Sequence, residues 1–166
     1  MQTFLRSNSL SPFSLFVCFA MVIFILCGTP NCFAEDSRDP NDWYERARAD
    51  FDAAQVLFDK TTHYAIVCFH AHQAAEKTLK GALISHGLVP NKFHYNAKMA
   101  EDLSRFDIRA GELIAPCKML DGIYVSSRYP RKFGIQFDQI EASSCVQNAK
   151  AVLELIEQDV NAEVAA

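Results

Sequence analysis

The chain has 166 residues, half of them hydrophobic and 22% charged, which is enough for one domain with a buried core but too little for two. Six glycines and six prolines exclude a collagen-like or Pro/Gly-rich disordered chain, and a net charge of -4 excludes a global basic field, so any anion site must be local. Six cysteines without a CxxC pair are too few for a disulfide scaffold and argue against a structural zinc site.

Residues 1–34 are typical of a signal-like hydrophobic leader. Residues 13–27 are apolar except for Ser14, which is the length of a signal-peptide core and falls short of the roughly 20 residues of a membrane-spanning helix. Cys32 and Ala34 place small residues where a signal peptidase cleaves. A short membrane anchor and a wrongly extended gene start are the alternatives. The leader therefore favours export or membrane anchoring.

A polar linker is predicted at residues 35–42, followed by two long helices at about 43–60 and 64–86. Asn41 or Asp42 can cap the first helix. Gly87 ends the second helix. Apolar residues recur at spacings of three and four in the first helix: Trp43, Ala47, Phe51, Ala54 and Phe58. The second helix has one core arc: Tyr64, Val67, Cys68, Ala71, Ala74, Ala75, Thr78, Leu79 and Ala82.

Three more helices are predicted downstream. A short one covers about 94–106, and a long one carries Pro116 in its first turn and stops before Pro130. Asp138 and Glu141 form a candidate capping box for the last helix. The buried side of that helix is predicted as Ile140, Ala149, Val152, Leu153 and Ile156. No strand pattern is present. We predict an all-α, up-and-down bundle of four long helices and one short helix at 43–160, with a C-terminal tail at 161–166.

A cation lies on the core row of the fourth helix. The row Leu113, Cys117, Leu120 and Tyr124 leads to Arg128. A buried guanidinium needs an acidic partner, a cleft or an anionic ligand. Arginine suits phosphate, and aromatic rings can stack on bases. In the alternative, Arg128 pairs with Glu76 or another acid and only locks the helices. More cations and rings follow, for which a solvated loop is the alternative: Tyr129, Arg131, Lys132 and Phe133.

The second helix carries a polar row. His72, Glu76 and Lys80 are spaced by four, and Gln73 and Lys77 lie beside them. A solvated helix face is the alternative to a binding site. No metal site, cofactor, serine nucleophile or glycine-rich phosphate loop is predicted, because the required spacings are missing. Three cysteines are interpreted as buried core residues: Cys68, Cys117 and Cys145.

Two blocks resemble one known family. Residues 64–80, YAIVCFHAHQAAEKTLK, and residues 124–130, YVSSRYP, are similar to signatures of HEPN domains, the nucleotide-binding helical domains of higher eukaryotes and prokaryotes. The second block is typical of a branch with a Tyr-x-x-x-Arg-Tyr-Pro motif. The resemblance spans about 43–160. It implies a helical bundle, usually a homodimer and usually cytoplasmic, often encoded beside a minimal nucleotidyltransferase as a toxin–antitoxin pair.

The same resemblance bears on catalysis. Ribonuclease members of the family carry Arg, four to six residues, then His. Arg128 matches the arginine, but residues 129–135 hold no histidine, and His94, in the preceding loop, is the candidate substitute. The incomplete motif favours a non-catalytic protein that binds a nucleotide or an RNA phosphate. A ribonuclease toxin with a non-standard partner for Arg128, or a plain dimerisation module, are the alternatives. The binding candidates are Arg128, Tyr124, Tyr129, Arg131, Lys132, Gln73, Glu76, Lys77 and Lys80.

A dimer face is predicted on the second helix. Ile66, Phe69 and Leu83 lie on the arc opposite its main core face, where Glu76 and Lys77 could pair across a twofold axis. In the alternative, other helices of the same subunit cover these residues.

Overall fold

The structure is a computed structural model that describes residues 36–90, 92–129 and 136–164. Within these residues it contains helices joined by loops and turns, which confirms the predicted all-α bundle. The predicted leader lies outside the described residues, and none of the described helices is long and apolar enough to cross a membrane. The elements are α2 (Pro40–Lys60), α3 (Tyr64–Ser85), α4 (Asn96–Leu103), the 3₁₀ helix η1 (Ile108–Leu113), α5 (Ile114–Arg128) and α6 (Gln139–Val164).

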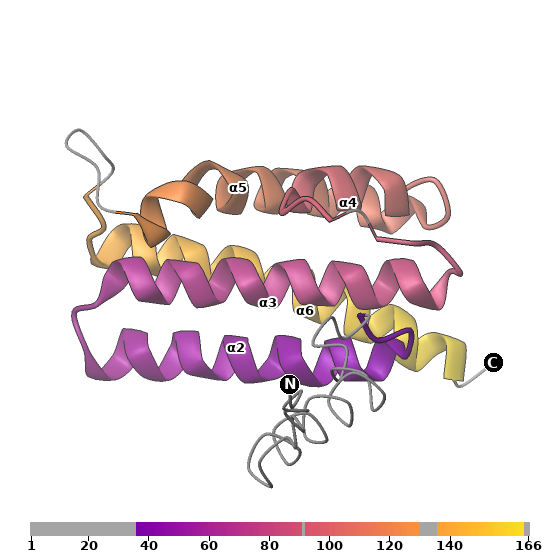
Figure 1. Ribbon diagram of the computed structural model, residues 1–166, viewed down its shortest axis with the longest axis horizontal. Helices are drawn as coiled ribbons and strands as arrows, with labels where there is room; N and C mark the ends of the chain where they lie inside the picture. Colours follow the sequence, from indigo (N-terminus) through magenta and orange to yellow (C-terminus); the bar gives the residue numbers. More distant parts are fainter. Residues whose placement is uncertain (1–35, 91, 130–135, 165–166) are drawn as a thin grey trace, which may run out of the picture. The chain divides into compact units, whose positions relative to one another are not determined.

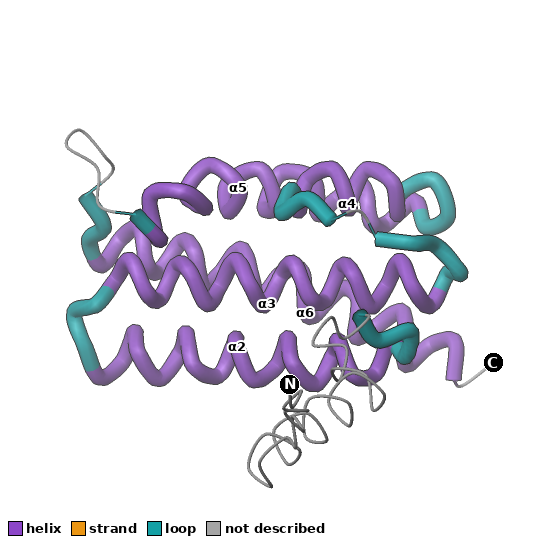
Figure 2. Tube along the Cα trace, in the orientation of Figure 1, coloured by secondary structure: helices purple, strands orange, loops and turns teal. Residues whose placement is uncertain are grey.

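Helix α3 is the central element of the bundle. It packs against α2, α6, α5 and α4, and Figures 1 and 2 show α2 on one side of it with α4 and α5 on the other. Small side chains let the neighbouring helices approach closely, because α3 presents alanines in several directions. The predicted core arc of α3 is confirmed, with Tyr64 partly buried and the rest fully buried: Val67, Cys68, Ala71, Ala74, Ala75, Thr78, Leu79 and Ala82.

Two helix ends test the sequence interpretation. The end of α3 is as predicted, with Gly87 at a φ of 72° just beyond it. The start of α2 is earlier than predicted. Asp39 caps the helix by accepting a hydrogen bond from Asn41 N at 2.9 Å, and Pro40 is the first helical residue. Residues 40–42 are therefore helical and do not belong to a linker, because proline is favoured in the first turn of a helix.

The last two helices follow the prediction, except that α6 continues to Val164, so residues 161–164 are helical and do not belong to the predicted tail. Helix α5 holds Pro116 in its first turn and ends at Arg128, although the 3₁₀ turn before it was not predicted. Asp138 accepts a hydrogen bond from Glu141 N at 2.9 Å, as expected of a cap. The prediction that Ile140 is buried is wrong, because its side chain is 78% exposed. Ile140 lies nine positions before Ala149, a spacing that places the two residues on opposite sides of a helix.

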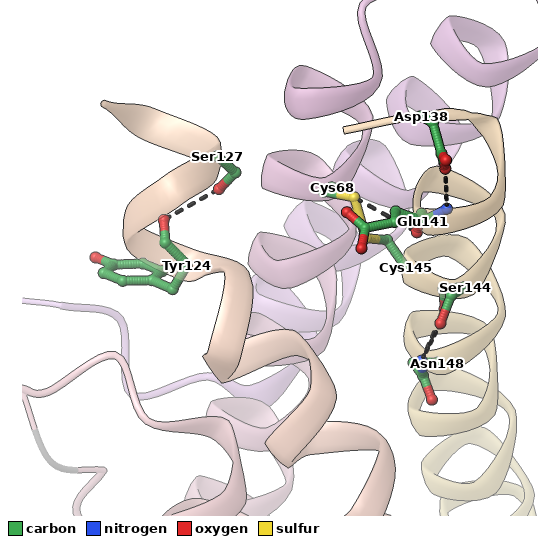
Figure 3. Close-up of a disulfide and its surroundings, with 8 residues drawn as sticks. All are labelled: Cys68, Tyr124, Ser127, Asp138, Glu141, Ser144, Cys145 and Asn148. Carbon is green, nitrogen blue, oxygen red and sulfur yellow. Dashed lines mark hydrogen bonds between the residues drawn. A yellow bond between two sulfur atoms is a disulfide. The ribbon is translucent and has the colours of Figure 1, made fainter. Parts of the chain in front are cut away.

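A disulfide corrects the interpretation of two cysteines. Cys68 of α3 and Cys145 of α6 are bonded with an S–S distance of 2.04 Å (Figure 3). Only Cys117, which is buried, is free among the cysteines of the described residues. The prediction of three plain core thiols is therefore wrong for two of them. The two cysteines lie 77 positions apart on different helices, and no local spacing indicates such a pair.

The predicted dimer face on α3 is also wrong. Leu83 is 3% exposed and belongs to the core of the same subunit. Phe69 is half-buried and lies under the guanidinium of Arg128. Ile66 alone of the three is exposed, so no apolar face remains there.

Candidate functional site

The polar row of α3 faces α4 and α5 and is buried. Glu76 is 3% exposed, and its carboxylate accepts hydrogen bonds from Lys80 Nζ at 2.8 Å and Gln73 Nε2 at 3.0 Å. His72, one turn earlier, is fully buried. The interpretation of this row as a solvated face is therefore wrong. The helix places its charged groups inside the protein, where each needs a partner.

His94 reaches Glu76 from the loop before α4. Its Nδ1 lies 2.9 Å and 3.0 Å from the two carboxylate oxygens of Glu76. Burial alone would raise the pKa of Glu76, but the hydrogen bonds and charges of Lys80 and His94 outweigh it and hold that pKa below its ordinary value. Glu76 is therefore an anion that anchors both a lysine and a histidine.

A second carboxylate fixes the loop that carries His94. Asp121 of α5 accepts hydrogen bonds from the backbone N–H groups of Asn96 and Ala97, both at 2.9 Å. These groups begin α4, whose own N-cap residue gives no side-chain hydrogen bond. Helix α5 thus sets the position of α4 and of His94 just before it.

His72 lies between the two carboxylates. Its Nδ1 is 3.8 Å from Glu76 Oε2 and its Nε2 is 3.5 Å from Asp121 Oδ1. Both distances allow an ion pair with a protonated ring, but neither nitrogen has a hydrogen-bond partner among the described residues. The ring also contacts Tyr124, with centroids 4.5 Å apart. His72 is therefore a buried side chain of α3 that contacts Asp121 and Tyr124 of α5.

Tyr124 and Arg128 complete the site. The Tyr124 ring stacks on His94 with centroids 5.2 Å apart, and the Cζ of Arg128 lies 4.2 Å from the centre of the same ring. Arg128 also lies over Phe69 at 4.7 Å. Burial raises the pKa of the Tyr124 phenol, and the charge of Arg128 opposes that shift only in part. The phenol stays neutral at physiological pH.

Arg128 has no acidic partner within the part of the chain that the structure describes. No carboxylate there lies within ion-pair distance of its guanidinium, and its Nε is buried without a hydrogen-bond partner. Glu76 is instead occupied by Lys80 and His94. The alternative in which Arg128 pairs with Glu76 is therefore wrong. A half-buried cation with donors to spare can hold an anion that comes from outside.

The structure brings most of the predicted site residues together. Lys77 is turned away, since it pairs with Asp50 of α2. Tyr129 is 63% exposed, and Arg131 and Lys132 lie outside the described residues. The sequence did not predict that His72 is buried against the two carboxylates, or that Asp121 and Asn96 contribute to the site. His72 lies one helical turn before Glu76, and Asp121 lies one turn before Tyr124. That spacing is the signal that could have identified them. The assembled candidates are Gln73, Glu76, Lys80, His94, Tyr124 and Arg128.

The described residues contain no group of three or more His, Cys, Asp or Glu side chains arranged to hold a metal ion. The chemistry that the site offers is that of an arginine on an aromatic platform, beside an imidazole held by a buried carboxylate.

Known proteins are similar to this chain in sequence and in fold. A family model described as the HEPN domain matches residues 40–159. A Methanocaldococcus jannaschii protein named "Putative toxin MJ1304" is 29% identical over 125 residues, which are 68% of this chain and 82% of that protein. The crystal structure of TT1696 from Thermus thermophilus is 30% identical, with a TM-score of 0.66, and covers 74% of this chain and 98% of its own. ST0689, an archaeal HEPN homologue, has the same coverage, 22% identity and a TM-score of 0.59, and it supports the fold alone.

Proposed function

The chain belongs to the HEPN domain family, and from that membership and the geometry of Arg128 we propose that it binds a phosphate group of a nucleotide or of RNA. The observation that carries the proposal is the guanidinium of Arg128, which lies over two rings and has a buried Nε without a partner among the described residues. A guanidinium offers paired N–H donors that match phosphate oxygens. The Tyr124 ring can pack beside a base or sugar.

Calorimetry with ATP and with a single-stranded RNA oligonucleotide tests this proposal. We expect Arg128→Ala to weaken binding by about 10- to 100-fold, which is the usual loss when a charged hydrogen bond is removed. Arg48→Ala is the matched control, because Arg48 is exposed and pairs with Glu157 on the surface. Equal affinity in the wild type and Arg128→Ala, or no binding in either, would contradict the proposal.

We also propose a homodimer, as the family resemblance implies, through the outer side of α5. Met119 and Val125 are exposed there about 120° apart, on the side opposite the core row, and the exposed Tyr129 follows the last residue of the helix. A Cβ added at Gly122, in the same arc, meets no atom within 4 Å. Sedimentation should give a dimer that Val125→Asp dissociates, whereas Ile66→Asp leaves it intact; a monomeric wild type contradicts the proposal.

A toxin–antitoxin role is the third proposal, and the relative named as a toxin favours it. In this setting the chain is the HEPN half of a pair with a minimal nucleotidyltransferase. Expression of the chain alone should arrest growth, and Arg128→Ala should relieve the arrest. Co-purification with the product of an adjacent nucleotidyltransferase gene tests the partner. Harmless expression of the wild-type chain would count against the toxin role.

The disulfide supports export of the chain. Disulfides persist in oxidising compartments and are rare in the cytosol, so Cys68–Cys145 agrees with the signal-like leader. An exported protein does not meet the ATP and RNA of the cytoplasm, so export would count against the nucleotide-binding and toxin–antitoxin proposals. Intact mass spectrometry of the native protein decides between the two settings: an N-terminus at Glu35 with oxidised cysteines supports export, and a retained Met1 with reduced cysteines supports the cytoplasmic pair.

A further inference from the structure

The two halves of α6 pack differently against the rest of the bundle. In the first half, residues 139–149, the buried side chains are all small: Ala142, Cys145 and Ala149. The larger Val146 packs against the core there but is only partly buried. In the second half, residues 150–160, the buried side chains are large: Val152, Leu153 and Ile156. Because hydrophobic stabilisation grows with the apolar area removed from water, packing holds the second half more strongly than the first.

The polar contacts of α6 show the same asymmetry. In the second half, Glu157 pairs with Arg48 of α2 at 2.9 Å, and Asp159 pairs with Arg109 of η1 at 2.6 Å. In the first half, the side-chain hydrogen bonds of the described residues stay within the helix: Gln147 donates to Ser143, and Asn148 donates to Ser144 (Figure 3). Polar side chains therefore tie the second half to other elements and leave the first half without such links in the described part of the chain.

The disulfide is the contact that fastens the first half of α6 to α3. Cys145 is bonded to Cys68, whose Sγ lies 3.7 Å from the backbone oxygen of Glu141, one turn before Cys145 (Figure 3). Glu141 Oε2 is buried without a hydrogen-bond partner among the described residues, which costs free energy as long as the segment is closed. The covalent bond therefore closes a segment whose non-covalent contacts are weak.

We propose that the Cys68–Cys145 bond is a redox-sensitive latch: a dithiol reductant that cleaves it releases residues 139–149 from α3 while the rest of the bundle stays folded. The side chains of the candidate phosphate site take no part, since they come from α3, α5 and the loop before α4. An opened segment is a substrate for proteases, so the latch limits the lifetime of the chain in a reducing compartment. This inference does not depend on the proposed phosphate site.

The reduction conserves atoms and electrons. A thiolate of the dithiol attacks the sulfur of Cys145, which is 5% exposed, whereas Cys68 is fully buried. Cys68 leaves as a thiolate and takes a proton from water. The second thiol of the reductant, after losing its proton, attacks the mixed disulfide and releases Cys145, which is protonated in turn. The protein gains two electrons and two protons, and the dithiol becomes a cyclic disulfide.

Cys117 provides the matched control. It is the free cysteine of the described residues and is fully buried in α5. Burial raises the pKa of its thiol, so Cys117 stays protonated and does not attack the disulfide. Cys117→Ala therefore removes a buried thiol without touching the latch.

Hydrogen exchange measured by mass spectrometry tests the latch on the full chain, with and without dithiothreitol. We expect reduction to speed amide exchange in residues 139–149 by about 10-fold or more, while residues 152–160 and α2 change little. Thermolysin should cut the reduced chain first within residues 139–149. Cys145→Ala should show the same exchange pattern without reductant, and Cys117→Ala should respond to dithiothreitol as the wild type does.

Four results would overturn the latch. Slow exchange in residues 139–149 after reduction means that packing alone holds the segment. Exchange that rises equally throughout the chain means that the bond stabilises the whole fold. A bond that resists dithiothreitol in the folded protein, seen by counting free thiols in the same samples, is no latch. A response lost in Cys117→Ala assigns the effect to the third thiol. If Cys145→Ala does not fold, reduction of the folded wild type decides.

Discussion

Two clusters of the same composition lie on α3, and they differ in what surrounds them. In each, a carboxylate accepts from the Nδ1 of a histidine at 2.9 Å and pairs with a lysine. The first cluster joins α2 to α3, and its side chains are all partly exposed. The second is centred on a buried carboxylate and joins α3 to the loop before α4. Their members are Asp50, His70 and Lys77 in the first, and Glu76, His94 and Lys80 in the second.

The clusters differ in the ring that each histidine contacts. His94 lies against Tyr124 and His70 against Phe69, and Arg128 lies over both rings, at 4.2 Å and 4.7 Å. The first satisfies its own charges and cross-links two helices, as many surface ion pairs do. Residue types alone therefore do not identify a site; the burial of the Glu76 carboxylate and the contact of His94 with Tyr124 set the second cluster apart.

The largest effect on stability should come from the disulfide that joins α3 to α6. Removing the disulfide with Cys145→Ala should lower the free energy of unfolding by about 4 kcal/mol, because the bond closes a long loop in the unfolded chain. Nucleotide affinity of the folded variant should be unchanged. Urea unfolding and calorimetry measure the two quantities. Cys117→Ala, which removes a free buried thiol, is the control and should cost much less.

Removing each of the two carboxylates should lower the free energy of unfolding by an amount that reflects how deeply it is buried. Glu76→Ala leaves Lys80 and His72 in buried surroundings and should cost about 3 kcal/mol in urea unfolding. Asp50→Ala breaks a partly exposed cluster and should cost at most about 1 kcal/mol. Equal losses would show that the clusters are energetically alike.

The stability supplied by Glu76 should also depend on pH. Its pKa in the folded protein is below the ordinary value of 4.5, so its ionised form stabilises the fold above that value. This contribution is lost as pH falls through the lowered pKa. The stability difference between wild type and Glu76→Gln should therefore be constant near neutral pH and shrink in acid. A difference that grows below pH 4.5 would contradict the assignment.

The smallest effect on nucleotide affinity should come from replacing Tyr124, whose ring both Arg128 and His94 contact. Tyr124→Leu removes the surface against which Arg128 and His94 lie, and should weaken nucleotide binding about 3- to 10-fold, as expected for one cation–π contact. Phe106→Leu removes a ring that stacks on His86 at the other end of α3. That control should bind as the wild type does.

Periodicity was sufficient to predict the fold and the cation, but not the contacts between helices. The core arc of α3, the glycine at its end and the stop of α5 at Arg128 follow from local rules, and all three are confirmed. The burial of Glu76 could not be predicted in the same way. Its hydrogen-bond partner His94 comes from a loop 18 positions away. The ion pair of Glu76 with Lys80, one helical turn later, is equally typical of a solvated face.

Tertiary contacts also explain the other misses. Asp121 acts on α4 from a different helix, 25 positions after the first residue it caps. The disulfide spans 77 positions. The predicted dimer face was wrong because Leu83, on the second apolar arc of α3, is covered within the subunit. A helix buried on several sides carries more than one apolar stripe, and the sequence does not state which neighbour covers each.

Ligand binding beside Arg128 can be followed directly by NMR of the histidine rings while ATP is added to the purified protein. His94 and His70 have the same Nδ1–carboxylate distance, but only His94 of the two lies against Tyr124, the ring proposed to pack beside the base or sugar. We expect the ring signals of His94 to shift with saturation while those of His70 stay in place, and we expect Arg128→Ala to abolish the shift. Binding that leaves His94 unmoved, or that shifts His70 equally, would contradict this expectation.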